Sequence, residues 1–126
     1  MMALRTGTPD TYGDFSVSID EAGEAPTFDE SSKTLTFSAA GEYTVGMADG
    51  KTSTTNRIEV TSASNITLDG VNIDVSSTEN AAAFKITDTA GAVNLILAGG
   101  SVNTLKSGKY CAGLQKDTTA EGTMLT

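Results

Sequence analysis

The feature that most constrains the fold of this chain is a repeat of about 30 residues that begins near Lys33. Each copy contains three short segments in which apolar and polar residues alternate, as in β-strands with one buried face. The first segments of the copies are 34–37, 65–68 and 94–97; the second are 43–45, 71–73 and 102–104; the third are 57–60, 83–86 and 112–115. Three such strands cannot bury their apolar faces alone, so the copies are expected to pack on one another.

Stacking the copies as coils would place equivalent apolar side chains in internal columns. The columns expected are Leu35, Ile66 and Leu95; Phe37, Leu68 and Leu97; Ile58, Phe84 and Ala112; and Val60, Ile86 and Leu114. The sequence therefore predicts an all-β fold, a right-handed parallel β-helix of about three coils of three short strands with an N-terminal β-structured cap. A β-sandwich is the alternative, but it would not require the three-strand pattern to recur in register.

The N-terminal residues differ from the repeats. They hold both prolines, an acidic run over 20–30 and one alternating segment, in which Phe15, Val17 and Ile19 share a face. We expect an N-terminal cap or extension over 1–32 and a repeat domain over 33–126, truncated at its C-terminus because 123–126 reads as the opening of another strand. The first residues lack the apolar region of a signal peptide.

Composition excludes several functional classes. Eight Lys and Arg against sixteen Asp and Glu give a net charge of −8, which disfavours nucleic acid and anionic lipid as partners. The absence of His excludes imidazole chemistry, and the single Cys111 excludes an internal disulfide or a cysteine metal cluster. No run approaches the about 20 apolar residues that membrane insertion needs. We expect no catalytic residue, no metal site and no cofactor.

The candidate ligand site is the segment 106–110 together with Gln115. Lys106, Lys109 and Tyr110 combine cations with an aromatic face for stacking on a sugar ring, and Gln115 adds an amide. The alternative is an ordinary loop, because the chain has no Trp and only three Tyr to build an aromatic platform.

Repeated polar residues on the strands have a structural interpretation. Asn65 and Asn94 occupy equivalent places, as do Asn72 and Asn103, and stacked amides can hydrogen-bond along the repeats or recognise sugar hydroxyls. Glu59 is expected to face outward opposite Lys85. Elsewhere the carboxylates could serve a glycosidase or bind calcium. A polysaccharide lyase would use a cation such as Arg57 beside a tight acidic cluster, which the sequence does not show.

Several runs resemble modules of large Firmicutes surface proteins. They are Thr-Thr-Asn-Arg-Ile-Glu-Val at 54–60, Asn-Ile-Thr-Leu-Asp-Gly-Val-Asn-Ile at 65–73, Ala-Ala-Phe-Lys-Ile at 82–86, Asn-Thr-Leu-Lys-Ser-Gly at 103–108 and Cys-Ala-Gly-Leu-Gln at 111–115. Such modules are described as carbohydrate-binding-domain-like or as pectate-lyase-like right-handed β-helices. The resemblance covers roughly residues 14–126 and implies a secreted or wall-attached bacterial protein, but no particular site residue.

Together these features predict a non-enzymatic extracellular module of a bacterial surface protein, acting as a rigid adhesive or carbohydrate-binding segment. The first alternative is the N-terminal part of a polysaccharide-degrading, lyase-like enzyme. The second is a structural module that self-associates end to end or through its edge strands. The expected partner is a glycan, and the expected location is the bacterial cell surface.

Overall fold

The computed structural model describes residues 10–19, 24–79, 81–87, 90, 92–109, 111, 114–116 and 124–125. The regular structure of these residues consists of β-strands. The strands are β1 (Asp10–Tyr12), β2 (Phe15–Ile19), β3 (Thr27–Asp29), β4 (Thr34–Phe37), β5 (Glu42–Met47), β6 (Arg57–Val60), β7 (Asn65–Leu68), β8 (Asn72–Asp74), β9 (Phe84–Ile86), β10 (Ala92–Leu97), β11 (Thr104–Lys106), β12 (Leu114–Lys116) and β13 (Met124–Leu125). In this described part of the chain there is no helix with the length and apolar character needed to cross a membrane.

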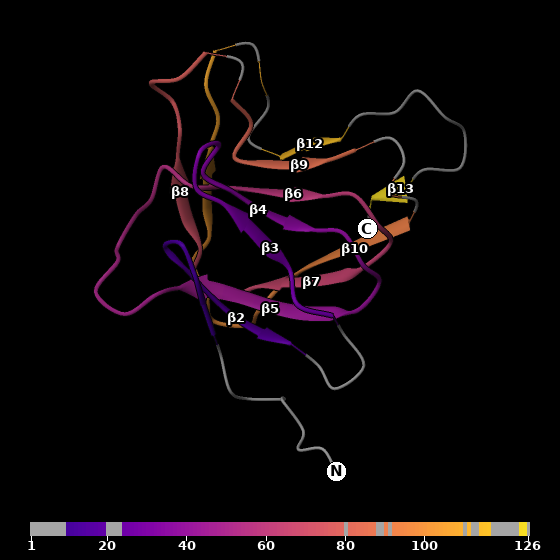
Figure 1. Ribbon diagram of the computed structural model, residues 1–126. Coiled ribbons are helices and arrows are strands. Elements are labelled where there is room, and N and C mark those ends of the chain that lie inside the picture. Colours follow the sequence, from indigo (N-terminus) through magenta and orange to yellow (C-terminus); the bar gives the residue numbers. More distant parts are fainter. Residues whose placement is uncertain are drawn as a thin grey trace.

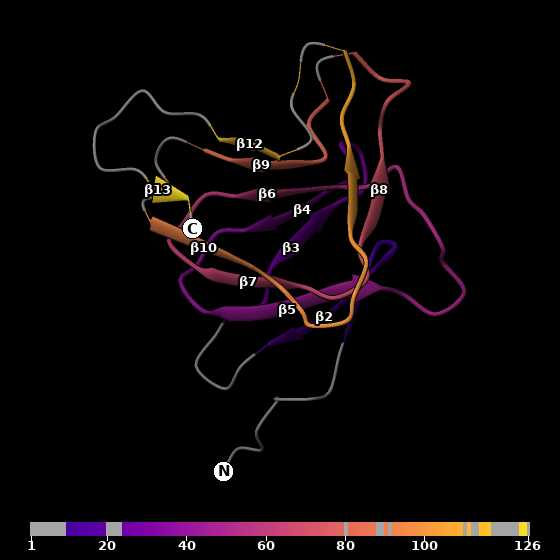
Figure 2. The ribbon, with the colours of Figure 1, turned by 180° about the vertical axis from the view of Figure 1, so that it is seen from behind.

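The strands form three sheets around one core (Figure 1). A six-stranded sheet has the order β1-β2-β5-β7-β10-β13, and a five-stranded sheet has the order β12-β9-β6-β4-β3. β8 and β11 form a two-stranded sheet that stands at one side, between the other two (Figure 2). Both large sheets therefore begin with N-terminal strands at one end of the molecule and finish with C-terminal strands at the other.

The predicted right-handed parallel β-helix with a separate cap is wrong, although the fold is all-β. The large sheets are mixed: β1 pairs with β2, β2 with β5 and β3 with β4 in antiparallel fashion, whereas the later pairs are parallel. β1 and β3 each end one of these sheets, and β2 lies between β1 and β5. Alternation reveals a buried face but not the direction of the neighbouring strand. Gly13, with a φ of 61°, makes the tight turn that an antiparallel β1–β2 hairpin requires.

The predicted register is correct where β7 pairs with β10 and where β6 pairs with β9, since Ile58 lies opposite Phe84 and Val60 opposite Ile86. β10 pairs with β7 so that Leu95 lies opposite Ile66, which confirms that equivalence. Leu35, however, lies opposite Ile58, and it is Tyr43 that lies opposite Ile66. The two large sheets carry the same alternation of apolar residues, so the pattern could not tell to which sheet the first segment belongs.

The second and third strands of the last repeat are shifted from the predicted register, whereas its first strand, β10, is not. Leu114 lies opposite Phe84, the place that Ala112 was expected to take, and Ala112 itself is outside the described residues. Thr104 lies opposite Asn72, so the predicted equivalence of Asn72 and Asn103 is wrong by one residue. The slip is two residues in β12, which leaves its two faces unchanged, and one residue in β11, which exchanges them. Segments of three residues carry too little alternation to fix the register from sequence.

One continuous core fills the space between the sheets. Phe15, Val17 and Ile19 share its inward face with the strands of the repeats, as the alternation predicted. The rings of Phe37 and Tyr43 meet there with centroids 4.6 Å apart. The largest fully buried side chains are Phe15, Phe37, Phe84, Leu35, Ile58, Ile66, Leu68, Ile73, Ile86, Val17, Val45 and Val60.

The outer faces of the sheets carry the polar side chains. Asn94 Nδ2 donates a hydrogen bond of 2.5 Å to Asn65 Oδ1, so the amide ladder is structural at this position. Asn103 Oδ1 instead accepts from the backbone N–H groups of Gly70 and Val71, each at 2.8 Å, and holds that turn.

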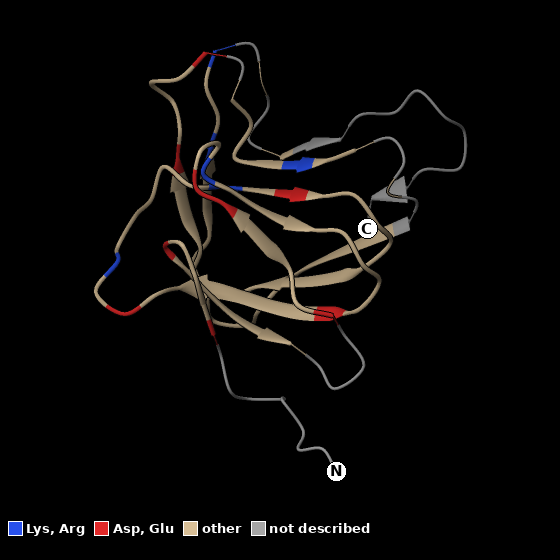
Figure 3. Cartoon of the chain, viewed as in Figure 1, with Lys and Arg blue, Asp and Glu red and all other residues tan. Residues whose placement is uncertain are grey.

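Glu59 on β6 lies opposite Lys85 on β9, as predicted for an outward pair (Figure 3). We expect the substitution Glu59→Gln to change the free energy of unfolding by less than about 1 kcal/mol, because partly solvated ion pairs contribute little. Urea denaturation of both proteins measures the difference. A loss of several kcal/mol would contradict the outward placement of this strand face.

Candidate functional site

Two adjoining grooves lie where the chain enters and leaves the strands. We call the first the Arg57 groove; its volume is about 550 Å³, and it is lined by Ser31, Ser32, Lys33, Thr55, Arg57, Val75, Thr78, Glu79 and Ala81. We call the second the Asp74 groove; its volume is about 540 Å³, and it is lined by Asp14, Ser53, Thr54, Thr55, Asp74, Ser76 and Ser77. Thr55 belongs to both, so the two grooves meet at this residue.

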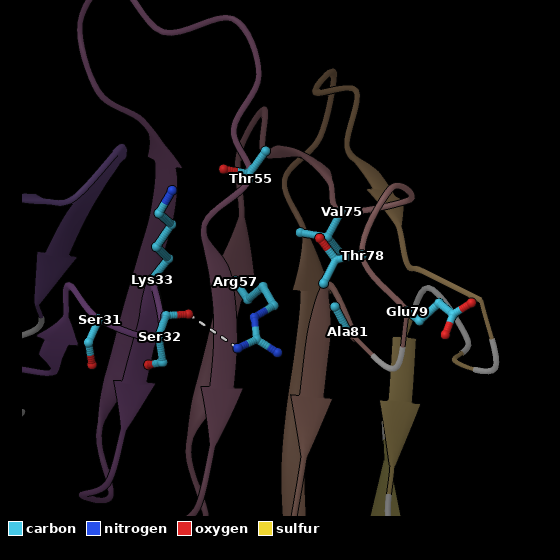
Figure 4. Close-up of a pocket in the computed structure, with 9 residues that line it drawn as sticks. All are labelled: Ser31, Ser32, Lys33, Thr55, Arg57, Val75, Thr78, Glu79 and Ala81. Atoms are coloured by element: carbon cyan, nitrogen blue, oxygen red, sulfur yellow. Dashed lines mark hydrogen bonds between the residues drawn. The ribbon is translucent and has the colours of Figure 1, made fainter.

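Parallel strand order builds the Arg57 groove (Figure 4). β4, β6 and β9 are neighbours in the five-stranded sheet, and the groove lies at the ends where these strands begin. Lys33 precedes β4, Arg57 opens β6, and Ala81 lies just before β9. The Arg57 backbone N–H donates to the carbonyl of Lys33 at 2.8 Å, which holds the start of β6 against the residue before β4. The sheet therefore brings residues from three separate turns to one surface.

Two cations face the Arg57 groove. Arg57 Nη2 donates to the carbonyl of Ser32 at 3.2 Å, which orients the guanidinium (Figure 4). Lys33 has a φ of 56°, a left-handed conformation that is uncommon for a non-glycine residue. Glu79 stands on the far side with its carboxylate turned away from Arg57. Among the described residues, neither cation lies within ion-pair distance of a carboxylate. These positive charges are therefore available to a ligand.

Carboxylates face the Asp74 groove. Asp74 Oδ1 accepts hydrogen bonds from the hydroxyl and the backbone N–H of Ser76, at 2.5 and 3.0 Å. These bonds, the hydroxyl first, hold the pKa of Asp74 below its ordinary value, and nearby Lys106 acts in the same direction. Asp14 accepts from the Thr54 hydroxyl at 2.7 Å and lies 3.5 Å from the Lys51 ammonium. The second groove thus offers oriented acceptors.

The two grooves together suit a ligand rich in hydroxyl groups. Pockets for drug-like molecules are mostly apolar, whereas these grooves are lined mainly by hydroxyls and charged groups. Cations donate, carboxylates accept, and the hydroxyl of a residue such as Thr55 can do both. Within the described ranges, no three Asp, Glu or Cys side chains gather in a way that could hold a metal ion.

Of the four site residues predicted from sequence, Lys106 and Lys109 have described side chains. Lys106 is exposed at the end of β11, opposite Asp74, and Lys109 is exposed in the following turn. Neither of them lines a groove. Tyr110 falls outside the described residues; Gln115 lies on β12, but its side chain is not described. Ligand binding by these four residues stays a prediction.

The backbone at Lys106 and Gly108, in the predicted segment, nevertheless forms hydrogen bonds with residues that line the Arg57 groove. The N–H of Gly108 donates to the carbonyl of Ala81, and the N–H of Val75 donates to that of Lys106, each at 2.8 Å. Ala81 and Val75 both line the groove.

Sequence reasoning missed the pairing of Lys33 with Arg57. A signal was present, because both are basic residues at the starts of alternating segments in an acidic chain. Thr34 lies opposite Arg57 in the structure, so Lys33 comes next to it. The prediction aligned 34–37 with 65–68 instead of with 57–60, so it did not place Lys33 beside Arg57.

No protein-family model, curated protein sequence or solved structure matches this chain significantly. The resemblance to modules of bacterial surface proteins therefore stays a prediction.

Proposed function

We propose that this protein is a non-enzymatic binding module that holds a carbohydrate across the Arg57 and Asp74 grooves. The observation that carries this proposal is the meeting of two polar grooves at Thr55. A sugar ring presents hydroxyls that both donate and accept, so its recognition needs both kinds of partner close together. Arg57 and Lys33 supply donors at one end, and Asp74 and Asp14 supply acceptors at the other.

The rigidity of the site supports an adhesive role. Hydrogen bonds of 2.8 Å tie Arg57 to Lys33 and Gly108 to Ala81, so the groove walls are fixed before a ligand arrives. A preformed site loses less conformational entropy on binding than a mobile one. The open groove would let a polysaccharide chain pass across the surface. The proposed setting is the outside of a bacterial cell, and it is supported by the resemblance of 54–60 and 65–73 to surface modules.

Thr55 offers the sharpest test because it lines both grooves. It is exposed, and its hydroxyl makes no hydrogen bond within the described residues, so Thr55→Ile leaves the fold intact. A glycan array of acidic and neutral plant, host and microbial sugars first identifies the ligand, and calorimetry then measures its affinity. We expect Thr55→Ile to weaken binding by about tenfold, the effect of a lost hydrogen bond plus a misplaced methyl group.

Thr44→Ile is the matched control. Thr44 is also an exposed threonine, but it lies on β5 and lines neither groove, so its substitution should leave the affinity unchanged. The absence of binding to every sugar on the array would contradict the proposed function. An equal loss of affinity in Thr55→Ile and Thr44→Ile would contradict it as well. Release of reducing or unsaturated sugar ends from a bound polysaccharide would show an enzyme instead.

A further inference from the structure

The two ends of the large sheets differ in how they finish. Among the strands that the structure describes, β1 pairs only with β2 and β3 only with β4 at one end, which we call the N-terminal end. At the other, which we call the C-terminal end, β11 and β12 each pair with one neighbour, and β13 covers only Ala92 and Val93 of β10. Among the described residues, the stretch 94–97 of β10 therefore pairs with β7 alone. Within the described part of the chain, each end thus presents strand edges of both large sheets that have no described neighbouring strand.

At the C-terminal end, apolar side chains next to the core are exposed to solvent. Val45, Leu68 and Leu97 follow one another across the six-stranded sheet; the first two are fully buried, whereas Leu97 is 63% exposed. Nearby, Ile96 is 47% exposed and Val102 is 81% exposed. These are the exposed large hydrophobic residues among those described. An apolar surface of this kind beside open strand edges is typical of an interaction site.

The N-terminal and C-terminal parts of the sequence differ in the sign of their net charge. The first 50 residues, which include β1 to β5, carry nine Asp or Glu and two Lys or Arg, a net charge of −7. The last 47 residues, which include β9 to β13, carry three Asp or Glu and four Lys or Arg, a net charge of +1. Two C-terminal ends would bring like charges such as Lys106 and Lys109 together. An acidic N-terminal end facing a C-terminal end is electrostatically favoured.

We propose that copies of this protein associate head to tail, with the C-terminal end of one copy packed on the N-terminal end of the next. In this arrangement both large sheets continue from one copy into its neighbour, because they run through the molecule in the same order. Burial of Leu97 and Val102 supplies the apolar contact, and strand pairing satisfies the open edges. Such a contact joins two different surfaces, so it extends into an open chain rather than a closed dimer.

Variants that block one end each test this arrangement. Leu97→Lys with Val102→Lys places charges on the C-terminal end, and Thr11→Lys with Thr27→Lys places the same charges on exposed positions of β1 and β3. All four residues are exposed or mostly exposed, so folding should be preserved, which circular dichroism verifies.

Thr44→Lys is the control, since it adds a lysine to an exposed position on β5, inside the same sheet.

Light scattering and analytical ultracentrifugation then distinguish the arrangements. We expect the mass of the parent protein and of the control to rise steadily with concentration. Each blocked variant alone should stay monomeric, and their mixture should form a heterodimer through the one pair of ends that remains intact. A parent that stays monomeric up to near-millimolar concentration would overturn the proposal. A parent mass that levels off at that of a dimer would also overturn it, if the variant with lysines at Thr11 and Thr27 still self-associates. Two C-terminal ends would then be paired with each other.

Discussion

Replacing Leu68 by aspartate is expected to remove a large part of the stability of the folded state. Leu68 is fully buried and lies between Val45 and Leu97 in the six-stranded sheet. A carboxylate at this position would have no partner in the apolar core, and the cost of burying it is about 3–5 kcal/mol. A domain of this size is stable by about 5–15 kcal/mol, so this single change removes a large part of its stability. Urea denaturation followed by far-ultraviolet circular dichroism measures the loss.

Thr67→Asp is the matched control for this experiment. Thr67 precedes Leu68 on the same strand, but its side chain is half-buried and alternates to the outer face. The same carboxylate there remains in contact with water, and we expect it to cost less than about 1 kcal/mol. If the two variants unfolded at the same urea concentration, the assignment of inward and outward faces would be wrong.

The alternation of apolar and polar residues predicted strands and their buried faces well, because this pattern records burial directly. It placed Phe15 on the core side and Leu95 next to Ile66, as the structure has them. It could not give strand direction or the choice between two sheets with the same pattern. Leu35 was therefore placed in line with Ile66, although it lies opposite Ile58 in the other large sheet. The short turns at Gly13 and at 30–33 were local signs of antiparallel hairpins.

The candidate site was harder to predict than the fold because it is built from turns. The sequence shows two cations and an aromatic residue close together at 106–110. A search by residue type finds only such groups of neighbours in the sequence. Lys33 and Arg57 are separated by more than twenty residues, and only the parallel pairing of β4 with β6 brings them together. Thr55 carries no distinctive signal in the sequence. Its proposed role rests on its position between the two grooves.

Gly108→Ala is expected to damage both stability and binding. A methyl group added at Gly108 would lie 1.6 Å from the carbonyl oxygen of Thr78 and 3.1 Å from that of Val75. Both are backbone atoms, so no side-chain rotation can relieve the clash, and the segment that carries Thr78 must move. Forced overpacking of a closely packed site costs about 1–3 kcal/mol, and a backbone clash this short lies at the upper end of that range. Thr78 and Val75 line the Arg57 groove, so the same movement should weaken ligand affinity at least tenfold.

Gly99→Ala separates this effect from the general consequences of replacing a glycine. Gly99 lies in the turn after β10, where an added methyl group meets nothing within 4 Å and the φ angle is not left-handed. We expect this variant to match the parent in urea denaturation and in calorimetric titration with the ligand found on the array. Loss of stability with unchanged affinity in Gly108→Ala would contradict the inference that this glycine positions the groove wall. Because Gly108 does not itself line the groove, a loss of both properties shows that it acts through the groove-lining residues that it contacts.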